Sequence, residues 1–254
     1  MPILPLAGRI ALVTGVSRPQ GIAFTLAERL ADLGATVFAS GWSAHDDEMP
    51  WGATSLDDHA LRYPIEQRDL ADASAAAGLV GAVVDRYGTL DIVLAVHARS
   101  SHDPLERVTA DELDRCWAVN VRSIVLMARQ WVERCPARTS GLGRFIWFTS
   151  GQAEQPMPSE LAYAITKAAL HQMTATVAHT LIDHGIVANC INPGPVDTGY
   201  ATGAAHAAVA SMFPGGRWGT PTDVANLVEF LVRDEGAWIQ GQVLNSEGGF
   251  RRTS

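Results

Sequence analysis

Ala11-Leu-Val-Thr-Gly-Val-Ser-Arg-Pro-Gln-Gly-Ile-Ala23 is the stretch that indicates how this chain folds. An apolar run ends at Thr14, a glycine-containing turn follows, and a helical pattern begins near Ile22. Such a turn exposes backbone N–H groups and a helix N-terminus to a pyrophosphate. By itself this is a weak indication, because many folds join a strand to a helix through glycine. The candidate phosphate-binding residues of the turn are Gly15, Ser17, Arg18, Gly21 and Ile22.

On both sides of this turn, short β-branched apolar runs alternate with longer helical patterns. The alternation is typical of βαβ units whose parallel sheet is covered on both faces. We therefore predict an α/β, doubly wound Rossmann fold of three layers with a seven-stranded parallel sheet, in one domain spanning residues 1–254. The expected strands are 10–14, 36–40, 62–68, 90–96, 145–149, 187–191 and 242–245, and the expected helices are 22–33, 74–87, 110–134, 161–184 and 223–233.

Composition limits the class of partner. The chain has 254 residues, 47% of them hydrophobic and 18% charged, and a net charge of -8, which indicates a globular protein without a basic surface for nucleic acid or anionic membranes. The N-terminus lacks a signal-peptide pattern and no apolar run is long enough to span a bilayer, so we expect a cytoplasmic protein that acts on small molecules. The three cysteines, Cys116, Cys135 and Cys190, are scattered, which predicts neither disulfides nor a metal site.

Four polar residues are predicted to meet at one edge of the sheet. Lys167 is the only lysine among 19 basic residues, and it follows Tyr163 by four positions, on the same helical face. A lysine ammonium can lower the pKa of a neighbouring phenol, so Tyr163 is the candidate acid/base of a proton transfer coupled to hydride transfer. Ser150 ends a strand at the carboxyl edge, where it would hold the substrate oxygen, and Asn120 would order a water for the proton.

The second strand bears on cofactor choice. Dinucleotide folds that favour NAD place an acid about 20 residues past the glycine turn, but the corresponding stretch Ala39-Ser40-Gly41-Trp42 contains none. Arg18 is suited to a 2′-phosphate by its fork of donors, although it is alternatively an ordinary solvated arginine. We therefore predict NADP, with NAD as the alternative, and include Trp42 among the cofactor-binding candidates.

Over nearly its whole length the chain resembles the short-chain dehydrogenase/reductase family, in the branch similar to 3-oxoacyl-carrier-protein reductases. The resemblance rests on Thr14-Gly15, Asp69-Leu70, Asn120, Ser150, Tyr163 with Lys167, Pro193-Gly194-Pro-Val-Asp-Thr198, Arg217-Trp-Gly-Thr-Pro221 and a closing Glu-Gly-Gly. It implies a catalytic tetrad of Asn120, Ser150, Tyr163 and Lys167, with Lys167 also bonding the nicotinamide ribose. It further implies that Asp69 and Leu70 bracket the adenine and that the stretch containing Pro193, Gly194, Val196 and Thr198 binds the nicotinamide. Asp69 has a second interpretation as a helix N-cap.

Two motifs depart from the family pattern. Five residues separate Gly15 from Gly21 where the family usually has three, so the phosphate cradle must be reshaped. Ala95-Val96-His97-Ala98 stands where the family has Asn-Asn-Ala-Gly, and His97 either approaches the cofactor ribose or merely packs. The altered motif and the absence of a basic docking patch disfavour an acyl-carrier substrate.

The resulting functional hypothesis is an NADP-dependent oxidoreductase that interconverts a ketone and a secondary alcohol. Its alternatives are a non-catalytic dinucleotide-binding regulator and a lyase or dehalogenase that uses Ser150 and Tyr163 without hydride transfer. Between Leu161 and Leu181 only Lys167 is charged, so part of this helix is expected to be buried in a homo-oligomer, a dimer or tetramer. Gln152, Glu154 and Met157 are the candidates for lining the substrate pocket, and the segment 194–219 is a candidate lid or an ordinary loop.

Overall fold

The computed structural model describes residues 4–56, 59–135 and 141–252 and contains a seven-stranded parallel sheet. Its strand order is β3-β2-β1-β4-β5-β6-β7, which confirms the predicted doubly wound fold. The strands are β1 (Ile10–Thr14), β2 (Thr36–Gly41), β3 (Ile65–Gln67), β4 (Ile92–Ala95), β5 (Gly143–Phe148), β6 (Ile186–Asn192) and β7 (Val243–Asn245).

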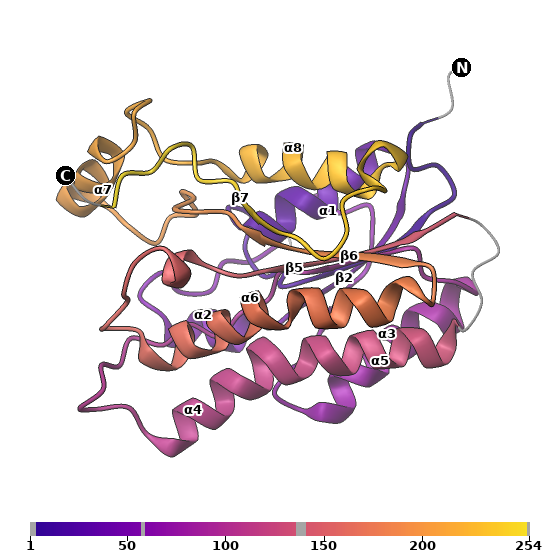
Figure 1. Ribbon diagram of the computed structural model, residues 1–254, viewed down its shortest axis with the longest axis horizontal. Helices are drawn as coiled ribbons and strands as arrows, with labels where there is room; N and C mark the ends of the chain where they lie inside the picture. Colours follow the sequence, from indigo (N-terminus) through magenta and orange to yellow (C-terminus); the bar gives the residue numbers. More distant parts are fainter. Residues whose placement is uncertain (1–3, 57–58, 136–140, 253–254) are drawn as a thin grey trace.

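Helices cover both faces of the sheet, giving three layers (Figure 1). One apolar core lies under α1 and α8, and the other lies under α3, α5 and α6. Because both faces are covered, the central strands are mostly apolar, and β6 is buried at every position, its two asparagines included. The helices are α1 (Ile22–Asp32), α2 (Ser43–Glu48), α3 (Ala73–Tyr87), α4 (Ala110–Trp117), α5 (Ser123–Arg134), α6 (Leu161–Ile182), α7 (Gly203–Ser211) and α8 (Pro221–Val232).

Three segments differ from expectation. The helix predicted over 110–134 is interrupted by a π-helical turn, Ala118–Arg122, which separates α4 from α5. The short helix α2 forms within the expected surface loop after β2, and α7 forms within the segment after β6. Helix α8 begins two residues earlier than predicted, because Thr220 and Asp223 form a reciprocal capping box ahead of Pro221.

The chain reverses its direction of winding at β1, whose neighbours are β2 and β4. Ligands of such sheets bind beyond the carboxyl ends of the strands at this switch point. Gly15 follows β1 with a φ of 85°, and a Cβ there would lie 2.7 Å from the His97 backbone nitrogen. Only glycine permits this approach, which brings the ends of β1 and β4 together. Among the described residues, no helix is both long and apolar enough to cross a membrane.

Candidate active site

A cleft of about 880 Å³ opens at this switch point, along the carboxyl ends of the strands. Ser150 and Tyr163 line it, whereas Asn120 and Lys167 lie behind its wall. The other predicted site residues that line the cleft are Gly15, Ser17, Arg18, Gly21, Ile22, Trp42, Asp69, Leu70, His97, Pro193, Gly194, Val196 and Thr198.

Tyr163 and Ser150 both line the cleft wall, and the Ser150 hydroxyl interacts with the Tyr163 phenol. Burial raises the pKa of Tyr163 to about 12, although Ser150 acts in the opposite direction. Lys167 is 2% exposed, and its Nζ donates to the Phe148 carbonyl at 2.8 Å. The ammonium also lies 5.3 Å from the centre of the Tyr163 ring. Burial sets the direction of the Tyr163 pKa shift and the Lys167 amine is directed at the end of β5, so the lowering of the Tyr163 pKa by Lys167 stays a prediction.

Lys167 is itself perturbed by its surroundings. Burial lowers its pKa to about 8, because the charged ammonium is removed from water. The thiols of Cys190 and Cys116 act in the opposite direction. The side chain thus remains mainly charged at pH 7, but its proton is far less tightly held than that of an exposed lysine.

Asn120 is fully buried in the π-helical turn and its amide is engaged on both sides. Its Oδ1 accepts from the Arg99 backbone nitrogen at 2.7 Å, and its Nδ2 donates to the Arg99 carbonyl at 3.0 Å. Nδ2 also donates to the Thr166 hydroxyl at 2.9 Å, next to Lys167. The Asn120 side chain thus clamps the loop after β4, and its role in ordering a water stays a prediction.

The His97 ring lies beneath the cleft rather than in it. Its Nδ1 is 2.5 Å from the Thr14 hydroxyl, and its Nε2 is 2.8 Å from the Ser123 hydroxyl and 3.1 Å from the Val119 carbonyl. The Val119 carbonyl can only accept, so Nε2 carries a proton, and in the neutral ring Nδ1 accepts from the Thr14 hydroxyl. Burial and the nearby charge of Lys167 lower the pKa of His97 to about 3. Of the two sequence interpretations, the geometry favours packing, while the backbone of His97 borders the cleft.

Arg18 faces an acid, Asp46, which follows the stretch 39–42 where an acid typical of NAD-binding folds would stand. Its Nε is 3.4 Å from Asp46 Oδ1, its Nη1 donates to the Thr198 carbonyl at 3.2 Å, and its guanidinium lies 5.1 Å from the centre of the Trp51 ring. Asp46 is 6% exposed and also accepts from Trp51 Nε1 at 2.8 Å. Arg18 is therefore not the solvated arginine of the alternative interpretation, since it spans the cleft from the turn to the segment after β6.

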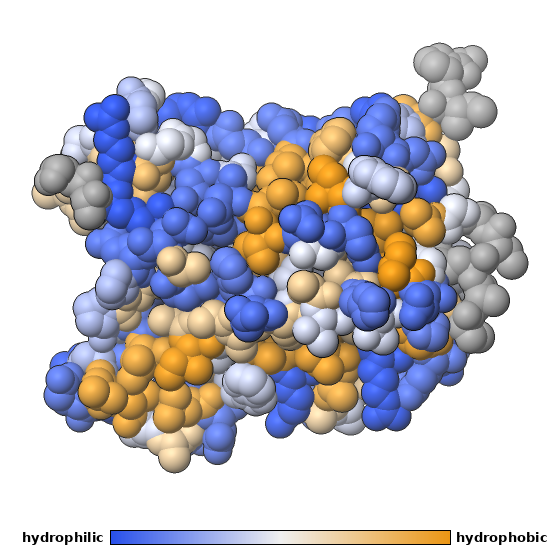
Figure 2. Space-filling view, in the orientation of Figure 1, coloured by the Kyte–Doolittle hydropathy of each residue, from blue (hydrophilic) through white to orange (hydrophobic). Residues whose placement is uncertain are grey.

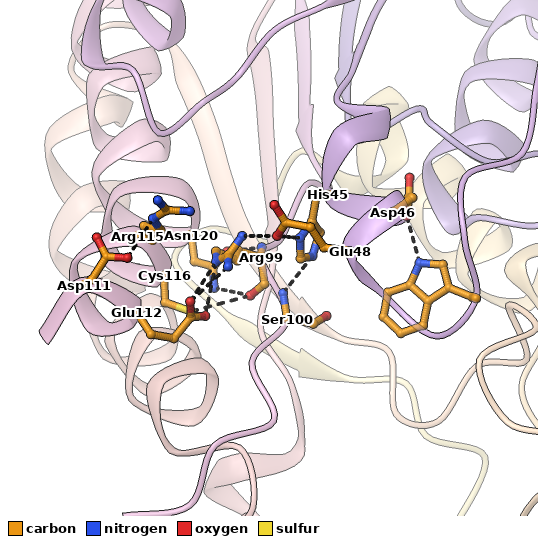
Figure 3. Close-up of polar contacts among 11 residues, drawn as sticks. His45, Asp46, Glu48, Arg99, Ser100, Asp111, Glu112, Arg115, Cys116 and Asn120 are labelled. Atoms are coloured by element: carbon orange, nitrogen blue, oxygen red, sulfur yellow. Dashed lines mark hydrogen bonds and ion pairs between the residues drawn. The ribbon is translucent and has the colours of Figure 1, made fainter. Parts of the chain in front are cut away.

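Arg99 is the residue of this site that sequence reasoning missed (Figure 3). Its guanidinium forms a bidentate pair with Glu112 of α4, with a shortest distance of 2.9 Å, and contacts Glu48 of α2 at 3.1 Å. The Ser100 backbone nitrogen donates to His45 Nε2 at 3.2 Å, which ties α2 to the same loop. Its place in the sequence could have identified it, because Arg99 directly follows the altered motif after β4.

Two smaller expectations are corrected by the contacts. Asp69 is not the N-cap of α3, because its Oδ1 accepts from the Ala71 nitrogen and the cap is Asp72, which accepts from Ser74. Met157 lines the cleft as expected. Gln152 bonds Thr149 and Glu154 accepts from Asn245, so neither of these two candidates lines it; their neighbours Gln155 and Pro156 do.

Comparison with known proteins agrees with this geometry. The model of a family described as enoyl-(acyl carrier protein) reductase matches residues 15–251. An uncharacterized oxidoreductase of Bacillus subtilis, YjdA, is 35% identical over 96% of this chain and 97% of its own length. A chloroplastic NADPH-dependent aldehyde reductase-like protein of Arabidopsis thaliana is 33% identical over 98% of this chain and 96% of its own. A short-chain dehydrogenase from Burkholderia cenocepacia, solved in complex with NADP, superposes with a TM-score of 0.81 at 31% identity, covering 96% of this chain and 98% of that one.

Proposed function

This chain belongs to the short-chain dehydrogenase/reductase family and is an NAD(P)-dependent oxidoreductase, and we propose that it uses NADP(H) to interconvert a ketone and a secondary alcohol. The observation that carries the proposal is that the interacting hydroxyls of Tyr163 and Ser150 line one cleft, with the Lys167 ammonium 5.3 Å from the centre of the phenol ring. A proton donor, an oxygen-binding hydroxyl and a cation are the groups that carbonyl reduction requires.

The residues of the cleft fit a phosphorylated dinucleotide. His45 Nδ1 and Asp46 Oδ2 are buried without a hydrogen-bond partner among the described residues, and both side chains line the cleft. These atoms are suited to the hydroxyls and base of an adenosine, while Arg18 and Arg68, on the same wall, are suited to a phosphate. When bound, the nicotinamide would supply or accept the hydride. The NADPH-dependent relative and the NADP-bound neighbour described above support this choice of cofactor.

The chain's own residues keep Tyr163 protonated at neutral pH, which is the form that donates a proton during reduction. With a pKa of about 12, Tyr163 holds its proton and is ready to donate it to a developing alkoxide. Ser150 would hold the same oxygen, and the buried charge of Lys167 would stabilise the phenolate that remains. Acting as a base on an alcohol would first require loss of that proton, which a pKa near 12 opposes.

The proposal is tested by following NADPH absorbance with a panel of ketones, in wild type and Tyr163→Phe. The variant should lose turnover, falling by two orders of magnitude or more for loss of the proton donor, and should still gain thermal stability from NADPH. Turnover that survives in the variant would remove Tyr163 from the reaction. NADPH binding without turnover of any ketone would favour the regulator, and absence of any NADPH effect would favour the lyase or dehalogenase alternative.

We also propose that the chain forms a homo-oligomer through α4 and α6. Apolar side chains gather along the lower edge of the molecule, over α4 and the start of α6 (Figure 2). Trp117 is 47% exposed and Ile165 is 45% exposed, and no exposed charge of α6 interrupts this face. A self-complementary dimer face is the simplest use of such a surface. Light scattering at several concentrations tests this, and a monomer at micromolar concentration would refute it.

A further inference from the structure

One carboxylate of the cleft has no partner. Nearly every charged side chain that lines the cleft forms an ion pair: Arg18 with Asp46, Glu48 with Arg99, Arg68 with Glu66, Arg115 with Asp111, and Arg252 with Glu247. The exceptions are Asp69 and Glu160. Asp69 accepts a backbone hydrogen bond, whereas the Glu160 carboxyl has neither a hydrogen bond nor an ion pair within the part of the chain that the structure describes.

Glu160 lies at the reacting end of the cleft. It is the N-cap residue of α6, three positions before Tyr163, and its side chain makes no capping hydrogen bond. Its negative charge acts to raise the pKa of both Tyr163 and Tyr200, so the carboxyl lies near both phenols. Burial raises the pKa of Glu160 itself, while His102 acts in the opposite direction. The carboxyl is thus half-buried, beside the acid/base residue and open to the cleft.

Fold stability does not explain glutamate at this position. Ser, Thr, Asp and Asn are the side chains that usually cap helices, and Glu160 makes no capping hydrogen bond, so its contribution to α6 is limited to the helix dipole. Burying an unpaired carboxylate opposes folding, as the direction of its pKa shift indicates. A group in the cleft that carries the opposite charge would remove this cost.

We propose that Glu160 is a specificity-determining residue that binds a positively charged group of the substrate, so that the preferred substrates are ketones or alcohols bearing an ammonium. This inference rests on the proposed function. Tyr200 adds a second element, because it lines the same cleft, is 49% exposed and is held edge-on to Trp218 with ring centres 5.5 Å apart. A carboxylate beside an exposed aromatic face is a suitable site for an organic cation.

The test compares two ketones of nearly equal shape that differ in charge. These are 5-(trimethylammonio)pentan-2-one and its neutral isostere 6,6-dimethylheptan-2-one, each reduced with NADPH by the full-length enzyme. We expect wild type to prefer the cation in kcat/KM by about tenfold, the scale of one charge pair near a protein surface. Glu160→Gln should abolish the preference, measured as the ratio of kcat/KM for the two ketones within the same variant, so that any effect of the lost charge on Tyr163 cancels.

Two further variants make the result specific to this carboxylate. Glu160→Asp keeps the charge and should retain part of the preference. Glu106→Gln removes an equal charge from an exposed position outside the cleft, and it should behave as wild type. Equal kcat/KM for the two ketones in wild type, or a preference that survives in Glu160→Gln, would overturn the inference. Reduction of the neutral ketone separates that outcome from failure of the proposed function, in which neither ketone is reduced.

Discussion

The buried imidazole of His97 should make the protein sensitive to acid through one identifiable group. In the folded chain its pKa is about 3, against 6.5 in an exposed histidine. Between these two values the unfolded chain binds the proton and the folded chain does not, so lowering the pH favours unfolding. Above pH 6.5 His97 therefore has little effect on the free energy of unfolding. This free energy then decreases progressively as the pH falls toward 3.

The size of the effect follows from the shift. The unfolded histidine is half protonated at pH 6.5 and almost fully protonated at pH 4.5, so the fall between these values costs about 2 kcal/mol from His97 alone. His97→Asn keeps an acceptor for the Thr14 hydroxyl and removes the titrating ring. The variant should be less stable at pH 7 by about 1–2 kcal/mol, because hydrogen bonds and packing around Ser123 are lost.

Urea unfolding at pH 6.5 and pH 4.5, at one protein concentration, measures this contribution. Other groups titrate alike in both proteins, so the difference between their two pH dependences isolates His97. We expect the variant to lose about 2–3 kcal/mol less than wild type over this interval. Parallel losses in the two proteins would refute the reasoning and would mean that the folded chain accommodates the charged ring.

Four further perturbations test the contacts around the cleft. Gly15→Ala should destabilise the protein by about 2–4 kcal/mol in thermal unfolding, because it adds a clash with the His97 backbone to the cost of a positive φ. Gly88→Ala is the matched control, because Gly88 has a φ of 80° with open space around it. This control should cost about 1 kcal/mol in the same assay. Arg18→Gln should raise KM for NADPH about tenfold while changing KM for NADH little, and an equal change for both cofactors would show that Arg18 does not bind the 2′-phosphate. Asp46→Asn frees Arg18 from its ion pair and should lower KM for NADPH, which steady-state kinetics with the two cofactors would reveal. Asn120→Leu leaves the Arg99 amide and carbonyl without their partner and should cost about 2–4 kcal/mol in urea unfolding, and a loss below 1 kcal/mol would contradict the clamp.

Local patterns were sufficient for the architecture and for the identity of the central side chains. The alternation of apolar strands and amphipathic helices predicted the seven-stranded sheet. A strand that is buried on both faces must be a run of mostly apolar residues, and such a run can be recognised within one short segment. The four-residue spacing of Tyr163 and Lys167 places both on one face of α6 by helical geometry alone. These features depend on residues that are neighbours in sequence.

Contacts between distant segments determined the remaining features. Arg18 meets Asp46 and Thr198, His97 meets Thr14 and Ser123, and these pairings exist only once several strands end at one edge. The direction of the Tyr163 pKa shift could not be predicted from sequence spacing, because the burial that raises this pKa is a property of the assembled layers. Sequence spacing can bring an amine near a phenol, but the hydrogen bond of Lys167 to the end of β5 depends on how α6 packs against the sheet.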